Sequence, residues 1–381
     1  MRVALFSEVY WPMVSGVSLT MQRAVEGLRE RGHAVRVYSA SYELPPGEAD
    51  RPEVHRSRSR ALFISPEVQW AFPRRDGIRA DLTRFQPDLV HLATEFPIGL
   101  AGLRSARELG LPIVASSHTD YERYAALYGL NWAVKPGWRY LRWFYGHASR
   151  VLCPSVAHQA HLHARGIRHT AIWSRGVDAE RFHPRHRSEA WRRSLGLGPD
   201  DLLVTYVGRV APEKGIDVLL DGWGLLGDLH DRTRLVFVGS GLMEAEIARR
   251  GLPGVSVAGF RRDGELSAAY ASADLFVLPS ATETFGNVLL EAMASGLPCI
   301  AAAAGGPMDF VDHGWNGWLV RPHDPPALAD ALRTLLADGS QRRRLARAAR
   351  ATAEARSWSA VHDALVAEYE RAIRAGRVAA A

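Results

Sequence analysis

Short apolar runs alternate along the whole chain with longer segments in which apolar positions recur every three or four residues. The first run, 2–6, is apolar almost throughout, as in a strand buried on both faces of a parallel sheet. A helical pattern follows at 17–31 and ends at Gly32, and a second apolar run occupies 34–38. Further strands are predicted at 88–92, 112–116, 149–155, 171–173, 202–208, 234–239, 274–278 and 298–302. This alternation predicts an α/β fold with parallel sheets.

A polar connector divides this pattern into two halves. It runs from about 176 to 199, and the strand-like runs restart at 202. With 381 residues the chain is longer than one hydrophobic core normally supports. We therefore expect two Rossmann-like domains with parallel sheets facing across a cleft, 1–176 and 177–357, and a last helix at 358–381. Ligands in such sheets bind at the carboxyl ends of the strands.

The composition is that of an ordinary globular protein, with 47% hydrophobic and 23% charged residues. No apolar run approaches the ~20 residues that a membrane-spanning helix requires, and we expect no signal peptide before the first strand. The two cysteines, Cys153 and Cys299, fall in different halves and indicate no disulfide framework. These features predict a cytoplasmic enzyme.

The formal net charge is +6, and the isoelectric point is near 9.5. Much of the arginine lies in the helical run 341–350, where a solvated helix face is the simplest account. No zinc-ligand spacing, RNA-binding signature or helix-turn-helix is recognisable. We therefore expect no nucleic-acid partner.

The stretch 279–296 contains the most informative motif. It follows an apolar strand and opens a helix through Gly286, so that Glu283 lies on the loop and Glu291 lies about one turn into the helix. The first amides of a helix have no partner inside it and bind anions readily. Two carboxylates that accept hydrogen bonds from hydroxyl groups, on either side of a phosphate site, describe a nucleotide-sugar pocket. Alone, this spacing is also compatible with two solvated glutamates.

A second motif, 207–215, places two cations five residues apart on a loop between a strand and a helix. These cations are Arg209 and Lys214. Arginine offers a planar fork to phosphate oxygens and lysine a point charge, so the pair could stabilise a departing diphosphate. Alone, cations on a surface loop are ordinary, and the motif gains weight only beside the preceding one.

The third motif follows the strand 112–116 and contains His118. An imidazole can hydrogen-bond a sugar hydroxyl or a phosphate and titrates near neutrality. A histidine at a strand end can equally cap the next helix, and both interpretations stay open. Asp120, Tyr121 and Tyr124 follow and are candidates for an acceptor wall or lid.

The fourth motif is the loop after the first strand. Gly16 precedes a helix, where a glycine lets the backbone approach a phosphate closely. Glu8 and Tyr10, on the same loop, are candidates for facing the acceptor.

These four motifs, in this order and over nearly the whole chain, resemble the family-4 retaining glycosyltransferases of the GT-B fold. The resemblance implies that Glu283 and the following backbone hold the donor sugar and that Glu291 holds the ribose. It implies that Arg209 and Lys214 contact the diphosphate, and that His118 contacts the sugar and its diphosphate. The backbone in question belongs to Phe285, Gly286, Asn287 and Val288. In the resembled fold the last helix crosses back to the first domain.

The chain departs from the family pattern at two loops. Many members have two glycines in the first loop, where this chain has Ser15 and Gly16, so only Gly16 is carried over as donor-binding. Asp309 stands where the family has a glutamate, and we assign it no catalytic role. Phe260 belongs to the segment that contacts the base in the family and is taken as donor-binding. The base itself stays open.

The segments 6–12 and 173–178 and the run Gly-Gly-Pro-Met-Asp look most like the mannosyl- and sulfoquinovosyl-transferring branch that builds glycolipids. The resemblance therefore implies a retaining hexosyltransferase, with GDP-mannose as first donor and a lipid or glycolipid as acceptor. A UDP-sugar donor, a nucleotide-sugar epimerase or hydrolase, and a membrane-surface sugar-binding module are the alternatives. No Asp-x-Asp metal site is evident, so we expect neither a metal nor another cofactor.

One segment suggests membrane contact independently. Residues 132–145 interleave aromatic and cationic side chains, as at an anionic lipid interface. Arg56, Arg58 and Arg60 are candidates for the same basic patch. A buried domain helix with solvated basic residues explains the pattern equally well. We expect a cytoplasmic protein. Whether it also makes peripheral contact with the inner face of the membrane stays open.

Overall fold

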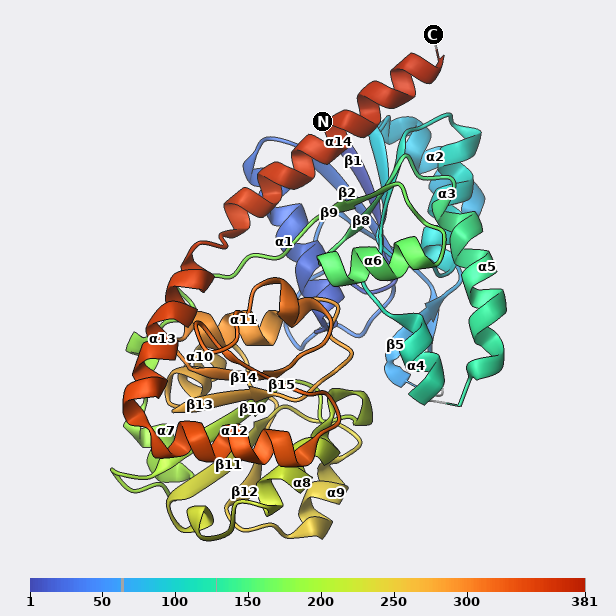
Figure 1. The fold of residues 1–381 in the computed structure, drawn as a ribbon. Helices are drawn as coiled ribbons and strands as arrows, with labels where there is room; N and C mark the ends of the chain where they lie inside the picture. Colours follow the sequence, from blue (N-terminus) through green and yellow to red (C-terminus); the bar gives the residue numbers. More distant parts are fainter. Residues whose placement is uncertain (63–64, 128, 381) are drawn as a thin grey trace. The chain divides into compact units, whose positions relative to one another are not determined.

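The computed structural model describes residues 1–62, 65–127 and 129–380. It divides into two compact units, which we describe separately (Figure 1). The first consists of Met1–Tyr121, Leu130–Arg175 and Trp358–Ala381, and the second of Glu122–Gly129 and Gly176–Ser357.

In the described chain, the first unit is built on a seven-stranded sheet with the order β3-β2-β1-β6-β7-β8-β9, and all its pairs are parallel. Its strands are β1 (Arg2–Phe6), β2 (Ala34–Ala40), β3 (Val54–Ser57), β6 (Leu89–Leu92), β7 (Ile113–Ser116), β8 (Arg150–Cys153) and β9 (Thr170–Ile172). A separate antiparallel hairpin is formed by β4 (Ser59–Leu62) and β5 (Ser65–Ala71). Its helices are α1 (Gly16–Glu30), α2 (Arg75–Phe85), α3 (Pro97–Glu108), α5 (Val134–Tyr145), α6 (Val156–Ala164) and α14 (Trp358–Ala380). Helix α4 (Tyr121–Leu127) falls at the division of the chain, and η1 (Asn131–Ala133) precedes α5.

The second unit contains a six-stranded parallel sheet, counted over the described residues, with the order β12-β11-β10-β13-β14-β15. Its strands are β10 (Leu202–Val207), β11 (Thr233–Val238), β12 (Val255–Gly259), β13 (Leu275–Leu278), β14 (Cys299–Ala302) and β15 (Trp318–Val320). Its α-helices are α7 (Glu189–Ser194), α8 (Ile216–Gly224), α9 (Glu244–Arg250), α10 (Asp263–Ala271), α11 (Asn287–Ala294), α12 (Pro325–Ala337) and α13 (Gly339–Glu354). Short 3₁₀ turns are η2 (Pro184–His186), η3 (Pro212–Lys214), η4 (Gly227–Arg232) and η5 (Gly306–Asp309).

Both sheets have the doubly wound order, which reverses direction beside their first strand. In the first unit, Ala4 and Phe6 pack with residues of α2, α3 and α5, whereas Val3 and Leu5 pack with residues of α1 and α14. Because both faces are covered, β1 is apolar almost throughout. The predicted α/β fold with parallel sheets is confirmed.

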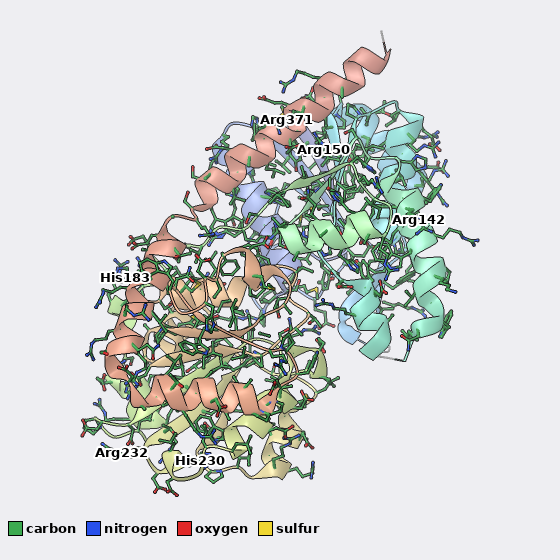
Figure 2. The ribbon with its side chains drawn as sticks, viewed as in Figure 1. Arg142, Arg150, His183, His230, Arg232 and Arg371 are labelled. Carbon is green, nitrogen blue, oxygen red and sulfur yellow. The ribbon has the colours of Figure 1, made fainter. Side chains whose placement is uncertain are left out.

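The last helix, α14, belongs to the first unit, as the family resemblance implied. Leu365 and Tyr369 are fully buried in that unit's core. Arg150 at the start of β8 lies 3.4 Å from Glu368 of α14, and Arg371 of the same helix also pairs with Glu368. Figure 2 labels both arginines. The helix is thus fixed to the first unit by apolar packing and by charge.

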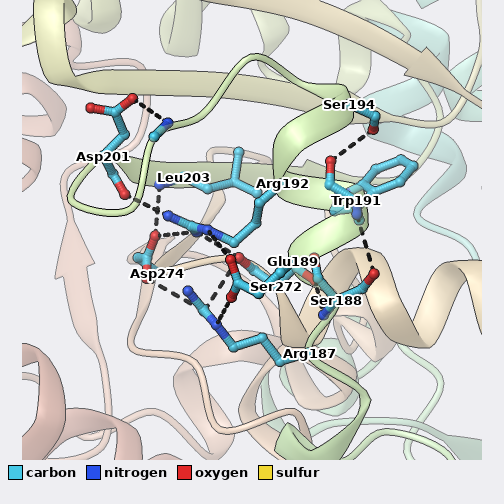
Figure 3. A network of polar contacts seen from close by, with 11 residues as sticks. Arg187, Ser188, Glu189, Trp191, Arg192, Ser194, Asp201, Leu203, Ser272 and Asp274 are labelled. Carbon is cyan, nitrogen blue, oxygen red and sulfur yellow. Dashed lines mark hydrogen bonds and ion pairs between the residues drawn. The ribbon is translucent and has the colours of Figure 1, made fainter.

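A buried arginine organises the start of the second unit (Figure 3). Arg192 of α7 is almost fully buried, and its guanidinium donates to Oδ2 of Asp274 at 2.8 Å and to the carbonyl of Ser272 at 2.9 Å. The same Asp274 oxygen accepts the amide of Leu203 at 2.8 Å. Arg192 therefore joins the polar connector to the strands β10 and β13, which carry the loops described below.

Two smaller expectations have mixed outcomes. Neither Cys153 nor Cys299 forms a disulfide, and both are buried. The arginine-rich run 341–350 lies in α13, with Arg343 and Arg344 exposed as expected. Arg350, in contrast, is turned inward and donates to the carbonyl groups of Ala179, Phe182 and Ala294, so the solvated-face interpretation is wrong for this residue.

Candidate active site

Two loops of the second unit meet where the strand order of its sheet reverses. One follows β10 and contains Arg209 and Lys214, and the other follows β13 and contains Glu283. Since β10 and β13 are neighbours, their carboxyl ends bring these loops together. This is the position at which doubly wound sheets bind ligands.

An ion pair joins the two loops. Nζ of Lys214 lies 2.6 Å from Oε1 of Glu283, with side chains only 19% and 14% exposed. Burial raises the pKa of Glu283, but the Lys214 ammonium, a Ser280 hydroxyl and the charge of Arg209 together outweigh it and leave the pKa below its ordinary value. Glu283 is therefore a charged hydrogen-bond acceptor at neutral pH.

Glu213 joins the loop after β10 to the loop after β13 by hydrogen bonds. The carbonyl of Glu213 accepts a hydrogen bond from Oγ1 of Thr282 at 3.0 Å and a longer one from Oγ of Ser280. The buried Glu213 carboxylate pairs with Arg209, which stays half-exposed. Arg209 and Lys214 are thus each paired with a carboxylate of the same unit.

The N-terminus of α11 has no side-chain cap. Gly286, its N-cap residue, adopts φ = +101°, a left-handed conformation that favours glycine. Phe285 is buried and stacks on Phe310 with ring centroids 5.1 Å apart, so only its backbone is available to a ligand. Asn287 and Val288 open the helix, and Oδ1 of Asn287 is buried without a hydrogen-bond partner in the described structure.

A second glycine allows this loop to have its shape. Gly306, in η5, donates its amide to the carbonyl of Glu283 at 2.9 Å. A Cβ atom on Gly306 would lie 2.2 Å from Cα of Phe285. Glycine is therefore required at this position for the backbones to approach. Asp309 lies at the end of η5, and we assign it no catalytic role.

Glu291 and Phe260 complete the predicted donor residues. Oε2 of Glu291, on α11, accepts a hydrogen bond from the Tyr270 hydroxyl at 2.9 Å, which fixes one side of the carboxylate. Phe260 follows β12, is half-exposed, and has the Arg262 guanidinium 5.1 Å above its ring. The structure thus brings together Arg209, Lys214, Glu283 and the α11 N-terminus, and it places Glu291 on the same helix.

In the first unit, His118 lies just after β7 and both its ring nitrogens are in hydrogen bonds. Nδ1 lies 2.9 Å from Nη2 of Arg175, and Nε2 lies 2.7 Å from Oγ of Ser116. The pKa of His118 is well below its ordinary value, mainly because of burial and secondly because of the Arg175 charge. The ring is neutral at pH 7. Its partners Ser116 and Arg175 both lie outside the next helix, α4, which the capping interpretation would have it cap.

Glu8 does not face outward, which corrects the expectation that it meets the acceptor. Its carboxylate is 2% exposed, and it accepts the amide of Ile98 at 2.6 Å and the hydroxyl of Thr94 at 2.8 Å. Phe96, the N-cap residue of α3, has no side chain that can cap, and Glu8 takes this role from the end of β1. Burial raises the pKa of Glu8 to about 7.

Tyr10 does not face outward either, contrary to the expectation that it faces the acceptor. It is fully buried in the core beside α1, and its hydroxyl has no hydrogen-bond partner in the described structure.

Asp120 is buried, with Oδ1 3.6 Å from Nε2 of His161. Tyr121 is partly buried and donates to Oε2 of Glu95 at 2.6 Å. Gly16 is the exposed first residue of α1, and its donor-binding role stays a prediction. The side chain of Tyr124 lies outside the described residues.

Sequence reasoning missed Arg175 and Glu95. Arg175 lies in the segment 173–178, whose resemblance to the glycolipid branch does not indicate a role for this charge. Glu95 is fully buried and accepts hydrogen bonds from Tyr121 and Tyr145. Its position after β6, beside Glu8 after β1, marks the reversal point of the first sheet and is the signal that could have found it.

A cavity of about 1160 Å³ lies elsewhere in the first unit, between the β2–β3 edge and α2. Three of its arginines, Arg58, Arg60 and Arg74, are exposed. The other lining residues are Tyr38, Ser41, His55, Arg56, Ser57, Ser59, Phe72, Gly77, Ile78 and Asp81. None of the predicted donor residues belongs to this cavity.

Two family models match the chain. The model described as Glycosyltransferase Family 4 matches residues 14–181, and the model described as Glycosyl transferases group 1 matches residues 187–352. A GDP-mannose-dependent alpha-mannosyltransferase of Mycobacterium tuberculosis is 39% identical, covering 99% of this chain and 98% of that protein. This chain is a family-4 glycosyltransferase.

Other similar proteins agree with this assignment. A sulfoquinovosyl transferase of Arabidopsis thaliana is 36% identical to this chain, and the alignment covers 94% of this chain and 71% of that protein. The solved structure of a sucrose-phosphate synthase from Thermosynechococcus elongatus shares the fold, with a TM-score of 0.80 and 22% identity over 98% of this chain and 99% of that one. The predicted GT-B fold and the predicted enzyme class are confirmed. No helix in the described part of the glycosyltransferase is both long and apolar enough to cross a membrane.

Proposed function

We propose that this glycosyltransferase moves mannose from GDP-mannose to a lipid or glycolipid acceptor with retention of configuration. The observation that carries the proposal is the Lys214–Glu283 pair beside the uncapped N-terminus of α11. It offers a cation, a charged acceptor of hydrogen bonds and free amides at the reversal point of one sheet. The choice of mannose and of the acceptor class rests on the names of the similar proteins.

Different residues contact the hexose, the phosphates, the ribose and the base of the donor. The Glu283 carboxylate accepts hydrogen bonds from hexose hydroxyls, and the amides of Phe285 to Val288 donate to the sugar and to phosphate oxygens. Glu291 accepts from the ribose, with its other side held by Tyr270. The unpartnered Oδ1 of Asn287 supports this assignment, because buried polar atoms normally have partners. Phe260 offers an exposed ring to the base.

In the transfer itself, the acceptor hydroxyl oxygen forms a bond to the anomeric carbon while the bond from that carbon to the β-phosphate oxygen breaks. GDP leaves with the electron pair, and the hydroxyl proton passes to a phosphate oxygen on the same face of the sugar. Attack on the face of departure retains the configuration. Arg209 and Lys214 stabilise the negative charge that develops on the phosphate. His118 donates a hydrogen bond to the sugar or its phosphate.

We also propose that this reaction uses no metal ion, because two fixed cations already take the role of a Lewis acid at the phosphate. Transfer should be unchanged after extensive dialysis against EDTA. A loss of activity that Mg²⁺ or Mn²⁺ restores would refute this part of the proposal.

We further propose that the first unit rests on an anionic membrane surface. Helix α5 buries Trp138 and Phe144, but Trp132 beside it is 77% exposed and Trp143 is 43% exposed. Lys135, Arg139 and Arg142 of α5 are exposed as well, and Figure 2 labels Arg142. Exposed tryptophans beside cations suit the headgroup region of a bilayer. The exposed arginines of the cavity suit an anionic headgroup.

Vesicle flotation tests the membrane proposal. The protein should float with phosphatidylglycerol vesicles at low salt, should not float with phosphatidylcholine vesicles, and should lose the interaction in 1 M NaCl. Trp132→Ala with Trp143→Ala should weaken flotation without unfolding the protein. Equal recovery with both lipids, or with neither, would count against the proposal.

The transfer proposal is tested with radiolabelled GDP-mannose and a bacterial lipid extract. We expect a labelled glycolipid whose new linkage is α by NMR, and much less label from UDP-glucose or UDP-galactose. Glu283→Gln should abolish the product. Labelled free mannose, an isomerised donor, or a preference for a UDP-sugar would each refute the stated function.

A further inference from the structure

A line of hydrogen bonds in the first unit runs through His118. Nη2 of Arg175 lies 2.9 Å from Nδ1 of His118, and Nε2 of His118 lies 2.7 Å from Oγ of Ser116. The same serine oxygen lies 2.9 Å from Nε2 of His91. Nδ1 of His91 lies 2.6 Å from the hydroxyl of Tyr369, on α14. We call these five residues the His118 relay.

The direction of the relay is set at the Arg175 end. A guanidinium has only donors, so Nδ1 of His118 must accept. A neutral imidazole carries one ring proton, which is therefore on Nε2. This N–H points at the oxygen of Ser116, which must accept it. His91 and Tyr369 support Ser116 from the other side.

The charges agree with this assignment. Burial lowers the pKa of Arg175 to about 9, so it remains a cation at pH 7. Burial, reinforced by that cation, holds the pKa of His118 well below its ordinary value, and burial alone lowers the pKa of His91 to about 3. Arg175 is itself anchored, because it donates to the carbonyl of Trp173 at 2.7 Å and to that of Ser174 at 3.0 Å.

We propose that Arg175 is a positioning residue that fixes His118 as the neutral ring with its proton on Nε2. The inference rests on the proposed function in one respect, namely that an oxygen of the sugar or its phosphate takes this N–H in place of Ser116. An oxygen arriving there meets a donor that is already protonated on the correct nitrogen. With the other tautomer it would meet a lone pair, and the contact would be lost.

Nitrogen NMR on the ligand-free protein tests the inference directly. Long-range ¹H–¹⁵N correlation distinguishes a protonated ring nitrogen from an unprotonated one, and His118→Gln identifies the signals among the 15 histidines. We expect Nδ1 of His118 to be unprotonated and Nε2 protonated at pH 7. A proton on Nδ1, or a charged ring, would overturn the inference.

Variants separate Arg175 from its neighbours. Arg175→Met should bring a measurable Nδ1–H fraction and should move the His118 titration toward ordinary pH, whereas Arg175→Lys keeps a donor and should behave as wild type. Ser116→Ala should leave the tautomer unchanged, and this test remains if Arg175→Met does not fold. A tautomer that shifts in Ser116→Ala but not in Arg175→Met would assign the role to Ser116 and refute ours. Arg168→Met, which changes an exposed arginine of the same unit, is the matched control.

Turnover provides the functional readout. Arg175→Met should lower kcat about 10-fold, as loss of an orienting partner does elsewhere, and should change the KM for the donor less. Arg175→Lys should restore most of kcat. Absence of mannosyl transfer in the wild type would refute the proposed function but leave the tautomer measurement intact. Transfer with the wrong tautomer would refute only the role of Arg175.

Discussion

Nζ of Lys214 and Oε1 of Glu283 lie 2.6 Å apart, although 69 residues separate them in the chain. Neither residue could be paired from local sequence, because each lies on the loop after a different strand. The sheet order makes β10 and β13 neighbours and so brings the two loops together. The pair keeps Glu283 charged and holds the Lys214 ammonium beside it.

Removal of the Lys214 charge should therefore impair catalysis more than stability. We expect Lys214→Met to lower kcat/KM for the donor by about 100-fold, similar to the loss of one donor at a developing negative charge. Burial would then act on Glu283 without its main opposing charge, so residual activity should rise with pH. The chain has only one other lysine, Lys135, and Lys135→Met is the matched control. Lys214→Met with normal kinetics would contradict the assignment.

The presence of only two lysines also permits a chemical test. Acetic anhydride should modify both Lys214 and Lys135 in the ligand-free protein, and mass spectrometry can follow each separately. GDP-mannose should slow acetylation of Lys214 at least about 10-fold once bound at saturation, because the ammonium then lies against phosphate. Lys135 serves as the internal reference and should react at an unchanged rate. Equal protection of both lysines, or of neither, would argue against a phosphate at Lys214.

The close approach of two backbones predicts a strong effect of one methyl group. A Cβ on Gly306 would lie 2.2 Å from Cα of Phe285, which backbone atoms cannot tolerate without moving. We expect Gly306→Ala to displace the loop that carries Glu283 and to weaken GDP binding at least about 10-fold, with an overpacking cost of about 2 kcal/mol. Calorimetry with GDP measures the first effect and urea unfolding the second. Gly264→Ala is the control, because nothing lies within 4 Å of its Cβ.

The buried carboxylate of Glu8 predicts a pH dependence of stability. Its pKa rises from 4.5 to about 7 on folding, mainly because of burial, so the folded state binds its proton more tightly than the unfolded chain does. The contribution of Glu8 to the free energy of unfolding is therefore fully present below pH 4.5 and is lost as the pH rises through 7. The loss amounts to about 3 kcal/mol, at about 1.36 kcal/mol per pKa unit. Glu8→Gln does not titrate, so its stability relative to wild type should increase between pH 5 and pH 8. Urea unfolding at both values measures this, and a constant difference would show that Glu8 titrates normally.

The network around Arg192 predicts a loss of stability without a direct effect on the donor residues. Arg192→Met leaves the carboxylate of Asp274 without its main cation, and removal of one partner of a buried pair costs about 3 kcal/mol. Arg193 is the adjacent exposed arginine, and Arg193→Met should change the free energy of unfolding by less than about 0.5 kcal/mol. Urea unfolding of both variants provides the comparison. Equal stability of the two would mean that the network contributes little.

The sequence predicted the central strands well and the edges poorly. Central strands such as β1 and β10 are covered on both faces, so nearly every position is apolar. Of the unpredicted strands, β3, β12 and β15 lie at sheet edges, where most of their residues are only partly buried, and β4 and β5 form the separate hairpin. Short, partly buried strands rarely produce a clear pattern, although the edge strand β9 was predicted.

The positions of the loops that carry Arg209 and Glu283 were predictable, because each loop directly follows an apolar run that forms a strand. Glu8 and Tyr10 were not, because nothing in a loop sequence says which side chain turns inward. Glu8 points inward because its carboxylate accepts the Ile98 amide at the start of α3. The N-cap residue Phe96 cannot cap that helix, and it is far from Glu8 in the chain. Such a long-range cap depends on the fold and cannot be seen locally.

The attachment of α14 to the first unit has a consequence for biosynthesis. Leu365 and Tyr369 complete a core that begins at Val3, so this half of the molecule lacks part of its interior until α14 has been translated. The second unit, which ends at Ser357, has all its strands available earlier. The part translated first is therefore the last to reach its native state.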